Sequence, residues 1–255
     1  MSKKTLLEKK ISKFINQYLN NYEFVYLTSD LRGFIKYFYP INPEEICKIL
    51  ISCLLKKNIT VIIPSFSYTS KGVFKVENNN SNLGFLTKWA IKDKRNTRSH
   101  HPIFSFCAIG KKQKLIKSIG KAAFGNKSVF YKLLAKKTSL LHFGRPFSMG
   151  NTFIHFVEQY VNADYRYEKV FPTKVYQGKK FLGSNFSAYV QKDLLHNKIK
   201  TNTKKIANIL KSKSFFKKVG SDKNLTNITH LDMKKTFKIM CQEFYKNNNI
   251  FISRI

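Results

Sequence analysis

Short runs of apolar and β-branched residues alternate with amphipathic helix patterns along the whole chain, and this alternation constrains the fold more than any other feature. Thr60 to Ile63 is a β-branched run closed by Pro64, which predicts a buried strand that enters a loop. Thr138 to Phe143 predicts another strand, which runs into Gly144. No linker or internal repeat interrupts the alternation. We therefore predict one α/β domain, residues 1–255, with helices covering a largely buried sheet.

Capping residues mark several of the helices. Asn42 is a cap, Pro43 takes the first helical position and Glu45 the third, which together predict a helix start. Residues 1–22 contain an amphipathic N-terminal helix, and 187–230 is expected to be a peripheral basic segment. Further helices are predicted at 83–91, 111–123, 129–136, 152–161, 187–197, 202–211 and 232–246. Further strands are predicted at 23–28, 103–109, 215–219 and 225–228, with a hairpin over 166–182 about Gln177-Gly178.

Length and composition exclude several classes of protein. A chain of 255 residues that is 43% hydrophobic can bury a full core, which argues against intrinsic disorder. No apolar run approaches the roughly 20 residues that span a bilayer, and residues 1–10 lack a signal-peptide pattern, so we expect no membrane span and a cytoplasmic protein. No CxxC pair occurs, so neither a disulfide framework nor a metal site is expected. The cysteines are Cys47, Cys53, Cys107 and Cys241.

The formal net charge of +33 suits an anionic partner. However, lysine greatly outnumbers arginine and occurs in every part of the chain, whereas specific nucleic-acid binders concentrate charge on one face and use arginine for bidentate contacts. We therefore expect solvated lysines and no specific nucleic acid. A non-enzymatic nucleic-acid-binding protein stays as the rival hypothesis. The charge favours anionic ligands and opposes polycations, unless a local acidic pocket overrides it.

Two histidines are candidates for acid–base chemistry. His155 and Glu158 stand three apart on the predicted helix 152–161, so their side chains share a face and can form a hydrogen bond. Such a pair suits a general base that a carboxylate holds in one tautomer, although an ordinary helix pair is the alternative. His101 lies in a loop that leads into the predicted strand 103–109, where a surface position without function is the alternative. Motifs of nucleotide hydrolases, dinucleotide enzymes, zinc proteases and nucleophile-elbow hydrolases are missing from the sequence.

Several short segments, taken in order, carry a further signal. They are Thr28–Leu31, Ile62–Ser67, Leu83–Thr87, Arg98–Pro102, Ser105–Gly110, Phe124–Ser128, Asn151–Glu158 and Val219–Gly220. In this combination the chain resembles the aminoglycoside 3-N-acetyltransferase family over roughly residues 25–247. No single motif is decisive, but the ordered set is fairly specific.

The resemblance implies a single layered α/β/α sandwich with a largely buried mixed sheet. It also implies transfer of an acetyl group from acetyl-coenzyme A, the acyl donor, to a primary amine of an amino sugar, without a metal. His155 or His101 would be the base, and Glu158 would orient the histidine and stabilise its cation. The resemblance further implies residues that bind the acyl donor: Thr28, Ser29, Ser65, Ser67 and Arg98.

The acceptor is where the chain departs from the family. Aminoglycosides are polycations, and few carboxylates are available to hold one: Asp164, Glu168 and Asp193 are the nearest candidates, and Gly183–Phe186 stands where acidic residues are expected. We therefore expect an anionic acceptor, such as a nucleotide-linked amino sugar of bacterial surface-polysaccharide biosynthesis. An antibiotic acetyltransferase is the alternative. The identity of the sugar, the acyl group and the oligomeric state, for which a dimer is one option, stay open.

Overall fold

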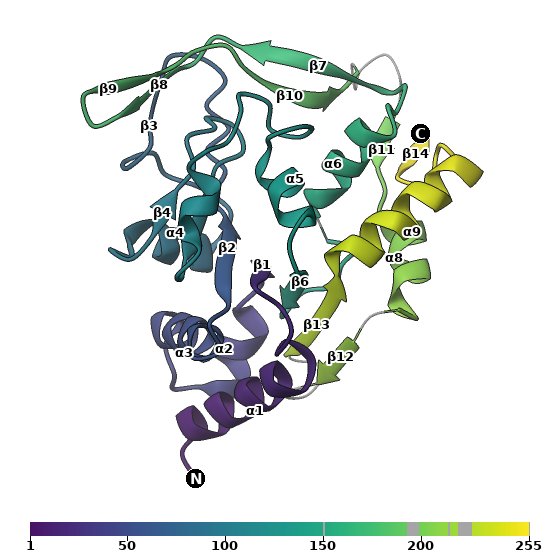
Figure 1. Ribbon diagram of the computed structural model, residues 1–255. Helices are drawn as coiled ribbons and strands as arrows, with labels where there is room; N and C mark the ends of the chain where they lie inside the picture. The colour runs from purple at the N-terminus through teal and green to yellow at the C-terminus, as the bar shows by residue number, and fades with distance from the viewer. Residues whose placement is uncertain (150, 193–198, 214, 219–225, 255) are drawn as a thin grey trace.

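A seven-stranded mixed sheet forms the centre of the protein (Figure 1). The computed structural model describes residues 1–149, 151–192, 199–213, 215–218 and 226–254. The sheet has the strand order β12-β13-β6-β1-β2-β5-β4. Its strands are β1 (Phe24–Ser29), β2 (Thr60–Pro64), β4 (Thr97–Arg98), β5 (Phe106–Ile109), β6 (Thr138–Phe143), β12 (Phe215–Lys218) and β13 (Asn227–Asp232). β1 is parallel to β2 and β6, whereas β5 and β13 run antiparallel to their neighbours.

Helices cover both faces of this sheet, because neighbouring residues of a strand point to opposite faces and both sets are apolar. Val25 and Leu27 pack with α1 (Lys3–Tyr18), α2 (Arg32–Phe38), α3 (Pro43–Leu55) and α4 (Phe85–Lys92). Phe24 and Tyr26 pack on the other side with α5 (Val129–Leu134), α6 (Phe153–Tyr160), α8 (Lys204–Lys211) and α9 (Met233–Lys246). The predicted α/β/α sandwich with a mixed sheet is confirmed.

Three small sheets accompany the central one. β7 (Arg166–Phe171) pairs with β10 (Phe186–Gln191), and β8 (Lys174–Gln177) lies between β3 (Val73–Lys75) and β9 (Lys180–Gly183). β11 (Ile199–Thr201) pairs with β14 (Ile252–Arg254). The first two of these sheets lie together beyond one end of the sandwich in Figure 1. The predicted turn at Gln177-Gly178 is confirmed, since Gly178 has φ +56° and connects β8 to β9.

Local signals predicted many elements correctly. In α3, Oδ1 of Asn42 accepts a hydrogen bond from the Glu45 amide at 2.8 Å, with Pro43 at the start of the helix. The predicted strands at 23–28, 60–63 and 138–143 correspond to β1, β2 and β6. Capping and periodicity act over a few residues, which is why the sequence alone was enough here.

Two predicted helices are wrong. In place of the helix at 111–123 there is a short 3₁₀ helix, Gln113–Ile116, because the Lys121 carbonyl and the Ala123 amide are hydrogen-bonded to Ser187 of β10. In place of the helix at 187–197, residues up to Gln191 belong to β10, which pairs with β7; residues 193–198 lie outside the described part. These backbone groups take distant partners, which local periodicity does not reveal.

Other boundaries differ as well. The strand predicted to begin at Ile103 begins at Phe106, and helix α2 and strand β14 were not predicted. The predicted strands 215–219 and 225–228 correspond to β12 and β13, although 219 and 225 lie outside the described residues. The segment 187–230, expected at the periphery, also contributes to the core: Ile206 and Leu210 of α8 are buried, and β13 lies next to β6 in the sheet.

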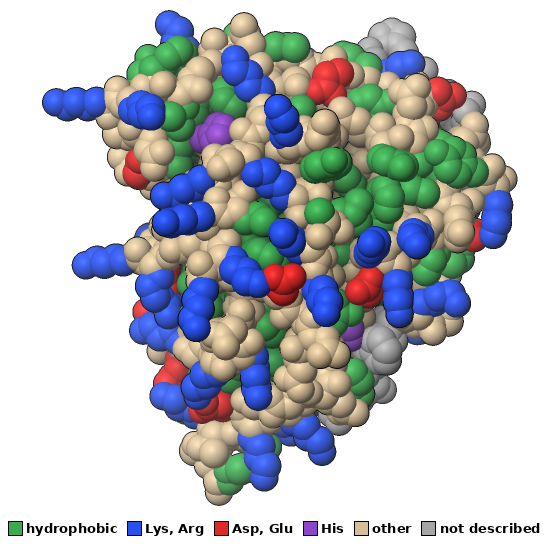
Figure 2. All heavy atoms as spheres, in the orientation of Figure 1, with side chains coloured by type: hydrophobic (Ala, Val, Ile, Leu, Met, Phe, Trp, Pro, Cys, Tyr) green, Lys and Arg blue, Asp and Glu red, His purple; other side chains and the backbone are tan. Residues whose placement is uncertain are grey.

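Basic side chains are scattered over the surface. On the face drawn in Figure 2, lysine and arginine occur over most of the area, with a few acidic side chains between them. This distribution resembles a solvated surface more than a single basic stripe. None of the described helices is long and apolar enough to cross a membrane.

Candidate active site

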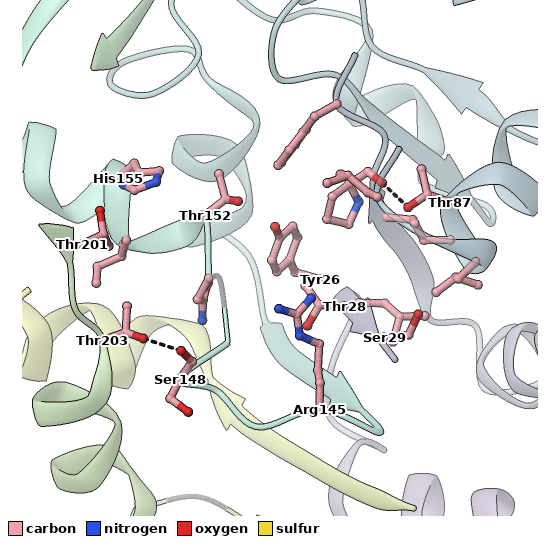
Figure 3. Close-up of a pocket in the computed structure, with 18 of the residues that line it drawn as sticks. Tyr26, Thr28, Ser29, Thr87, Arg145, Ser148, Thr152, His155, Thr201 and Thr203 are labelled. Carbon is pink, nitrogen blue, oxygen red and sulfur yellow. Dashed lines mark hydrogen bonds between the residues drawn. The ribbon is translucent and has the colours of Figure 1, made fainter. Parts of the chain in front are cut away.

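A cavity of about 640 Å³, which we call the central cavity, opens where β1 and β2 end. Ligand sites of α/β sheets commonly lie at the carboxyl ends of parallel strands. Figure 3 shows His155 and Thr152 on one side of the cavity and Thr87 and Ser29 on the other, with Tyr26, Thr28 and Arg145 between them. The polar lining also includes Tyr68, Ser148, Asn151, Lys200, Thr201, Asn202, Thr203, Lys204 and Ser253.

The loop between β6 and α6 carries much of this lining. Gly144 has φ +74°, which a residue with a side chain rarely adopts, and its amide donates to the Asn227 carbonyl at 2.7 Å. Further along, Oδ1 of Asn151 accepts from the Phe153 amide at 3.1 Å, where α6 begins. The loop is thereby anchored at both ends, and the start of α6 is fixed at the cavity wall.

His155 and Glu158 form the hydrogen bond that their spacing predicts. Nδ1 of His155 lies 2.7 Å from Oε2 of Glu158. The His155 side chain is 23% exposed and lines the cavity, whereas the Glu158 side chain is fully buried. A carboxylate accepts and does not donate, so Nδ1 carries a proton and Nε2 of the neutral ring has the lone pair. This arrangement provides a base held in one tautomer.

Glu158 receives two further donors. The Tyr165 hydroxyl donates to Oε1 at 3.1 Å, and Nε of Arg166 lies 2.6 Å from Oε2. Burial acts to raise the pKa of Glu158, but the hydrogen bond and charge of His155, together with Arg166, outweigh it and hold this pKa below its ordinary value. Glu158 is therefore a carboxylate, able to stabilise a positive charge on His155.

His101 does not line the central cavity. Its Nε2 lies 3.0 Å from the Ser187 carbonyl, and its Nδ1 accepts from the amides of Ile103 and Phe104 at 3.2 and 3.0 Å. Burial lowers the pKa of His101 to about 4. Both ring nitrogens are engaged by the backbone, which fits a neutral histidine that joins a loop to β10. This geometry offers no free nitrogen for a base.

The predicted acyl-donor residues divide into two groups. Thr28 and Ser29 line the central cavity at the end of β1. Arg98 is buried, and its guanidinium donates to the carbonyls of Val76, Asn79 and Ser65 and to the Ser105 hydroxyl. These bonds use the guanidinium inside the protein and leave it badly placed to meet the phosphates of a coenzyme.

Ser65 and Ser67 also make internal contacts. The Ser65 hydroxyl donates to Oγ of Ser105 at 3.2 Å, and the Ser67 hydroxyl donates to the Pro102 carbonyl at 2.6 Å. Neither residue lines the central cavity, although Phe66 and Tyr68 do. The motif Ile62–Ser67 thus contributes Ile63, Pro64 and Phe66 to the cavity wall, and its serines hold the loop in place.

The described lining of the central cavity is basic. It contains Arg145, Lys200 and Lys204 but no aspartate or glutamate. Asp164 is exposed, the Glu168 carboxylate accepts from Nε2 of Gln159 at 3.0 Å, and neither lines the cavity; Asp193 lies outside the described residues. The described part of the cavity therefore favours a negatively charged ligand.

Sequence reasoning missed several of these residues. Arg145 was interpreted as part of a turn, and Lys200 to Lys204 as a peripheral helix start. The Thr203 hydroxyl donates to the Ser148 carbonyl at 2.7 Å, which holds this segment beside the β6–α6 loop. Tyr26 was interpreted as part of a strand, yet its buried hydroxyl lies at the cavity. No local pattern identifies these contacts, because each partner is distant in sequence.

The described residues contain no cluster of three or more His, Cys, Asp or Glu side chains that could hold a metal ion. All four cysteines are buried and free.

Comparison with known proteins relates the chain to one family. The sequence model for aminoglycoside 3-N-acetyltransferase matches residues 53–241. No curated protein sequence matches the chain. Similar solved structures include the aminoglycoside acetyltransferase AAC(3)-IVa apoenzyme, with 17% identity and a TM-score of 0.71, covering 96% of this chain and 90% of that one. At these identities the likeness establishes the fold.

Two other solved structures give the same result. The YokD protein from Bacillus subtilis has 15% identity and a TM-score of 0.72, covering 94% of this chain and 99% of that one. Sisomicin-bound AAC-VIa has 13% identity and a TM-score of 0.73, covering 94% and 97%.

Proposed function

Since the chain belongs to the aminoglycoside 3-N-acetyltransferase family, an enzyme family, we propose that it transfers an acetyl group from acetyl-coenzyme A to a primary amine of an anionic amino sugar. The observation that carries the proposal is the His155–Glu158 pair at the wall of the central cavity, with Nδ1 and Oε2 2.7 Å apart. Family membership also argues against the rival hypothesis of a non-enzymatic nucleic-acid-binding protein.

His155 acts as the general base in this reaction. An amine with a pKa above 7 must lose a proton to form an amide, so Nε2 of His155 accepts a proton as the amine nitrogen attacks the thioester carbon. The C–N bond forms, the C–S bond breaks, and the proton passes from the imidazolium to the leaving thiolate. Glu158 stabilises the imidazolium meanwhile, and its own charge is held in place by Arg166.

Hydroxyl groups at the end of β1 bind the acyl donor. Thr28 and Ser29 line the cavity on the far side of Tyr26 from His155 (Figure 3), so a donor bound there and an acceptor at His155 share one space. Of the residues that the resemblance implied for this role, Ser65, Ser67 and Arg98 have internal partners instead. We keep only Thr28 and Ser29 for the acyl donor.

The charge of the cavity supports an anionic acceptor. Arg145, Lys200 and Lys204 line it, and no carboxylate does so among the described residues. A polycation would meet these three charges without a described compensating group, whereas a phosphate or carboxylate on the sugar would pair with them. A nucleotide-linked amino sugar fits this description, which suggests surface-polysaccharide biosynthesis as the setting.

An aminoglycoside acceptor is the second candidate. Two solved structures similar to this chain are titled as complexes, one with a gentamicin and one with sisomicin. The experiment is to compare kcat/KM for tobramycin with that for a panel of phosphorylated and nucleotide-linked amino sugars, following release of free thiol. We expect a phosphorylated or nucleotide-linked sugar to be acetylated at least about 10² times more efficiently.

The opposite result decides as clearly. If tobramycin is turned over with the higher kcat/KM, the acceptor is a polycation and the anionic assignment is wrong. If no amine in the panel releases thiol and acetyl-coenzyme A does not raise the melting temperature, the acetyltransferase assignment is wrong. His155→Ala serves as the matched control for slow thiol release without enzyme catalysis.

A further inference from the structure

Thr28 and His142 form a buried pair at the floor of the central cavity. They stand opposite each other in the register of the parallel strands β1 and β6, with Oγ1 of Thr28 2.9 Å from Nδ1 of His142. Thr28 lines the cavity, whereas His142 does not line it and is 2% exposed. The histidine thus lies behind the hydroxyl, away from the ligand space.

The surroundings of His142 determine which ring nitrogen carries the proton. Burial, together with the nearby charge of Arg145, lowers the pKa of His142 to about 3, so the ring is neutral under ordinary conditions. Nε2 is buried and has no hydrogen-bond partner. If the proton were on Nε2, a buried N–H would lack an acceptor, which is rarer in proteins than a buried acceptor that lacks a donor. The proton therefore belongs on Nδ1.

This tautomer fixes the role of the Thr28 hydroxyl. A hydroxyl has one proton to donate and two lone pairs that accept. When Nδ1–H of His142 donates to Oγ1, one lone pair of Thr28 is used and the hydroxyl proton stays available for another acceptor. The cavity is where a ligand can provide that acceptor.

We propose that His142 is a positioning residue whose Nδ1–H turns the Thr28 hydroxyl into a hydrogen-bond donor toward the cavity, where it binds a carbonyl oxygen of the acyl donor. The assignment of the ligand rests on the proposed function, but the tautomer does not. A thioester oxygen gains negative charge as the C–N bond forms, so a donor fixed in advance would lower the barrier of that step. No proton is transferred to or from His142.

The tautomer can be tested without activity. The ¹⁵N chemical shifts of labelled histidine distinguish a protonated ring nitrogen from an unprotonated one. His142→Asn provides the assignment of the signal. In the ligand-free protein we expect Nδ1 of His142 to be protonated, Nε2 to be unprotonated, and neither signal to move between pH 5 and pH 8. A proton on Nε2, or a titration within that range, would overturn the proposal.

Kinetics test the coupling of the two side chains. We expect Thr28→Val and His142→Leu each to lower kcat/KM for acetyl-coenzyme A by about 10-fold or more, and the double variant to be no slower than Thr28→Val alone. His142→Asn keeps an N–H donor near the position of Nδ1 and should regain most of the rate. Losses that multiply in the double variant, or an inactive His142→Asn that is folded, would contradict the proposal.

The sheet contains a matched control. Nδ1 of His230 lies 3.2 Å from Oγ of Ser139, again between neighbouring strands, but these residues face α1, where Tyr22 contacts the His230 ring, and do not line the cavity. Ser139→Ala and His230→Leu should lower the melting temperature without changing kcat/KM. If they reduce kcat/KM as much as the His142 variants, loss of core packing explains the effect and the positioning role fails.

The two proposals fail in different ways. Acetyl transfer absent from the wild-type protein, with the expected ¹⁵N signals, would reject the proposed function and the assigned ligand but leave the tautomer intact. Normal acetyl transfer with a proton on Nε2 would reject the role of His142 alone.

Discussion

Nδ1 of His155 lies 2.7 Å from Oε2 of Glu158, and this hydrogen bond connects the wall of the central cavity to a carboxylate that has no exposed surface. The same oxygen lies 2.6 Å from Nε of Arg166. One carboxylate thus fixes the histidine tautomer and balances a buried guanidinium. Its catalytic and structural roles cannot be changed independently by a single substitution at Glu158.

Replacing His155 should remove activity and leave the fold intact. We expect His155→Ala to lower kcat by about 10² or more, because the proton acceptor for the amine is lost. The melting temperature should change by only a few degrees, since the side chain is 23% exposed. Thiol release and thermal unfolding measure the two effects. His100→Ala, outside the central cavity, is the control and should retain the wild-type rate; full activity of His155→Ala would show that another group is the base.

Replacing Glu158 should reduce both rate and stability. Glu158→Gln leaves the Arg166 side chain, 5% exposed, without its ionic partner, and breaking a buried pair costs about 3 kcal/mol or more. Urea unfolding would measure this cost. In the double variant Glu158→Gln, Arg166→Met the stability should largely return, because both charges are gone, while the activity should not. Recovery of activity in the double variant would show that Glu158 acts only through the fold.

Stability should fall in mild acid because several histidines are buried and neutral. Burial lowers the pKa of His101 and of His230 to about 4 each, whereas an unfolded histidine has a pKa near 6.5. Between these values the unfolded chain binds more protons, so the free energy of unfolding decreases as the pH falls from about 6.5 to 4, by up to about 3 kcal/mol per histidine.

Urea unfolding at pH 7.5 and pH 5 tests this pH dependence. The variant His101→Asn keeps an acceptor for the amides of Ile103 and Phe104 but has no titrating ring, so its stability should change less between the two pH values. Equal stability of the wild-type protein at both values would contradict the neutral buried state. Glu158 does not confuse this test, because its pKa lies below the ordinary value and its contribution is lost only at more acidic pH.

Two lysines at the cavity should matter for an anionic acceptor. We expect Lys200→Gln and Lys204→Gln to raise the KM of a phosphorylated amino sugar, together by about 10-fold at low salt and less at high salt. Lys205 is exposed, adjacent in α8 and outside the described lining, so Lys205→Gln is the matched control. Steady-state kinetics at two ionic strengths measure the effect. An equal response to Lys205→Gln would mean that only the overall charge matters.

The sequence predicted the parts of this protein that short-range physics controls. Asn42 and Pro43 start α3 because capping satisfies amides within one turn, and the buried strands are visible as apolar β-branched runs. The His155–Glu158 pair belongs to the same class, since residues three apart on a helix share a face. The ordered motifs also predicted the family and its layered fold.

The tertiary structure alone decided which polar groups meet at the cavity. Thr28 and His142 are 114 residues apart, and the register of β1 and β6 brings them together. Likewise Arg98, expected to bind the acyl donor, is enclosed by carbonyl groups from two other segments, and Lys200 reaches the cavity from a segment expected at the periphery. A local pattern records the period of a chain but not the partners of its buried polar groups, because those partners are supplied by strand register and helix packing between distant segments.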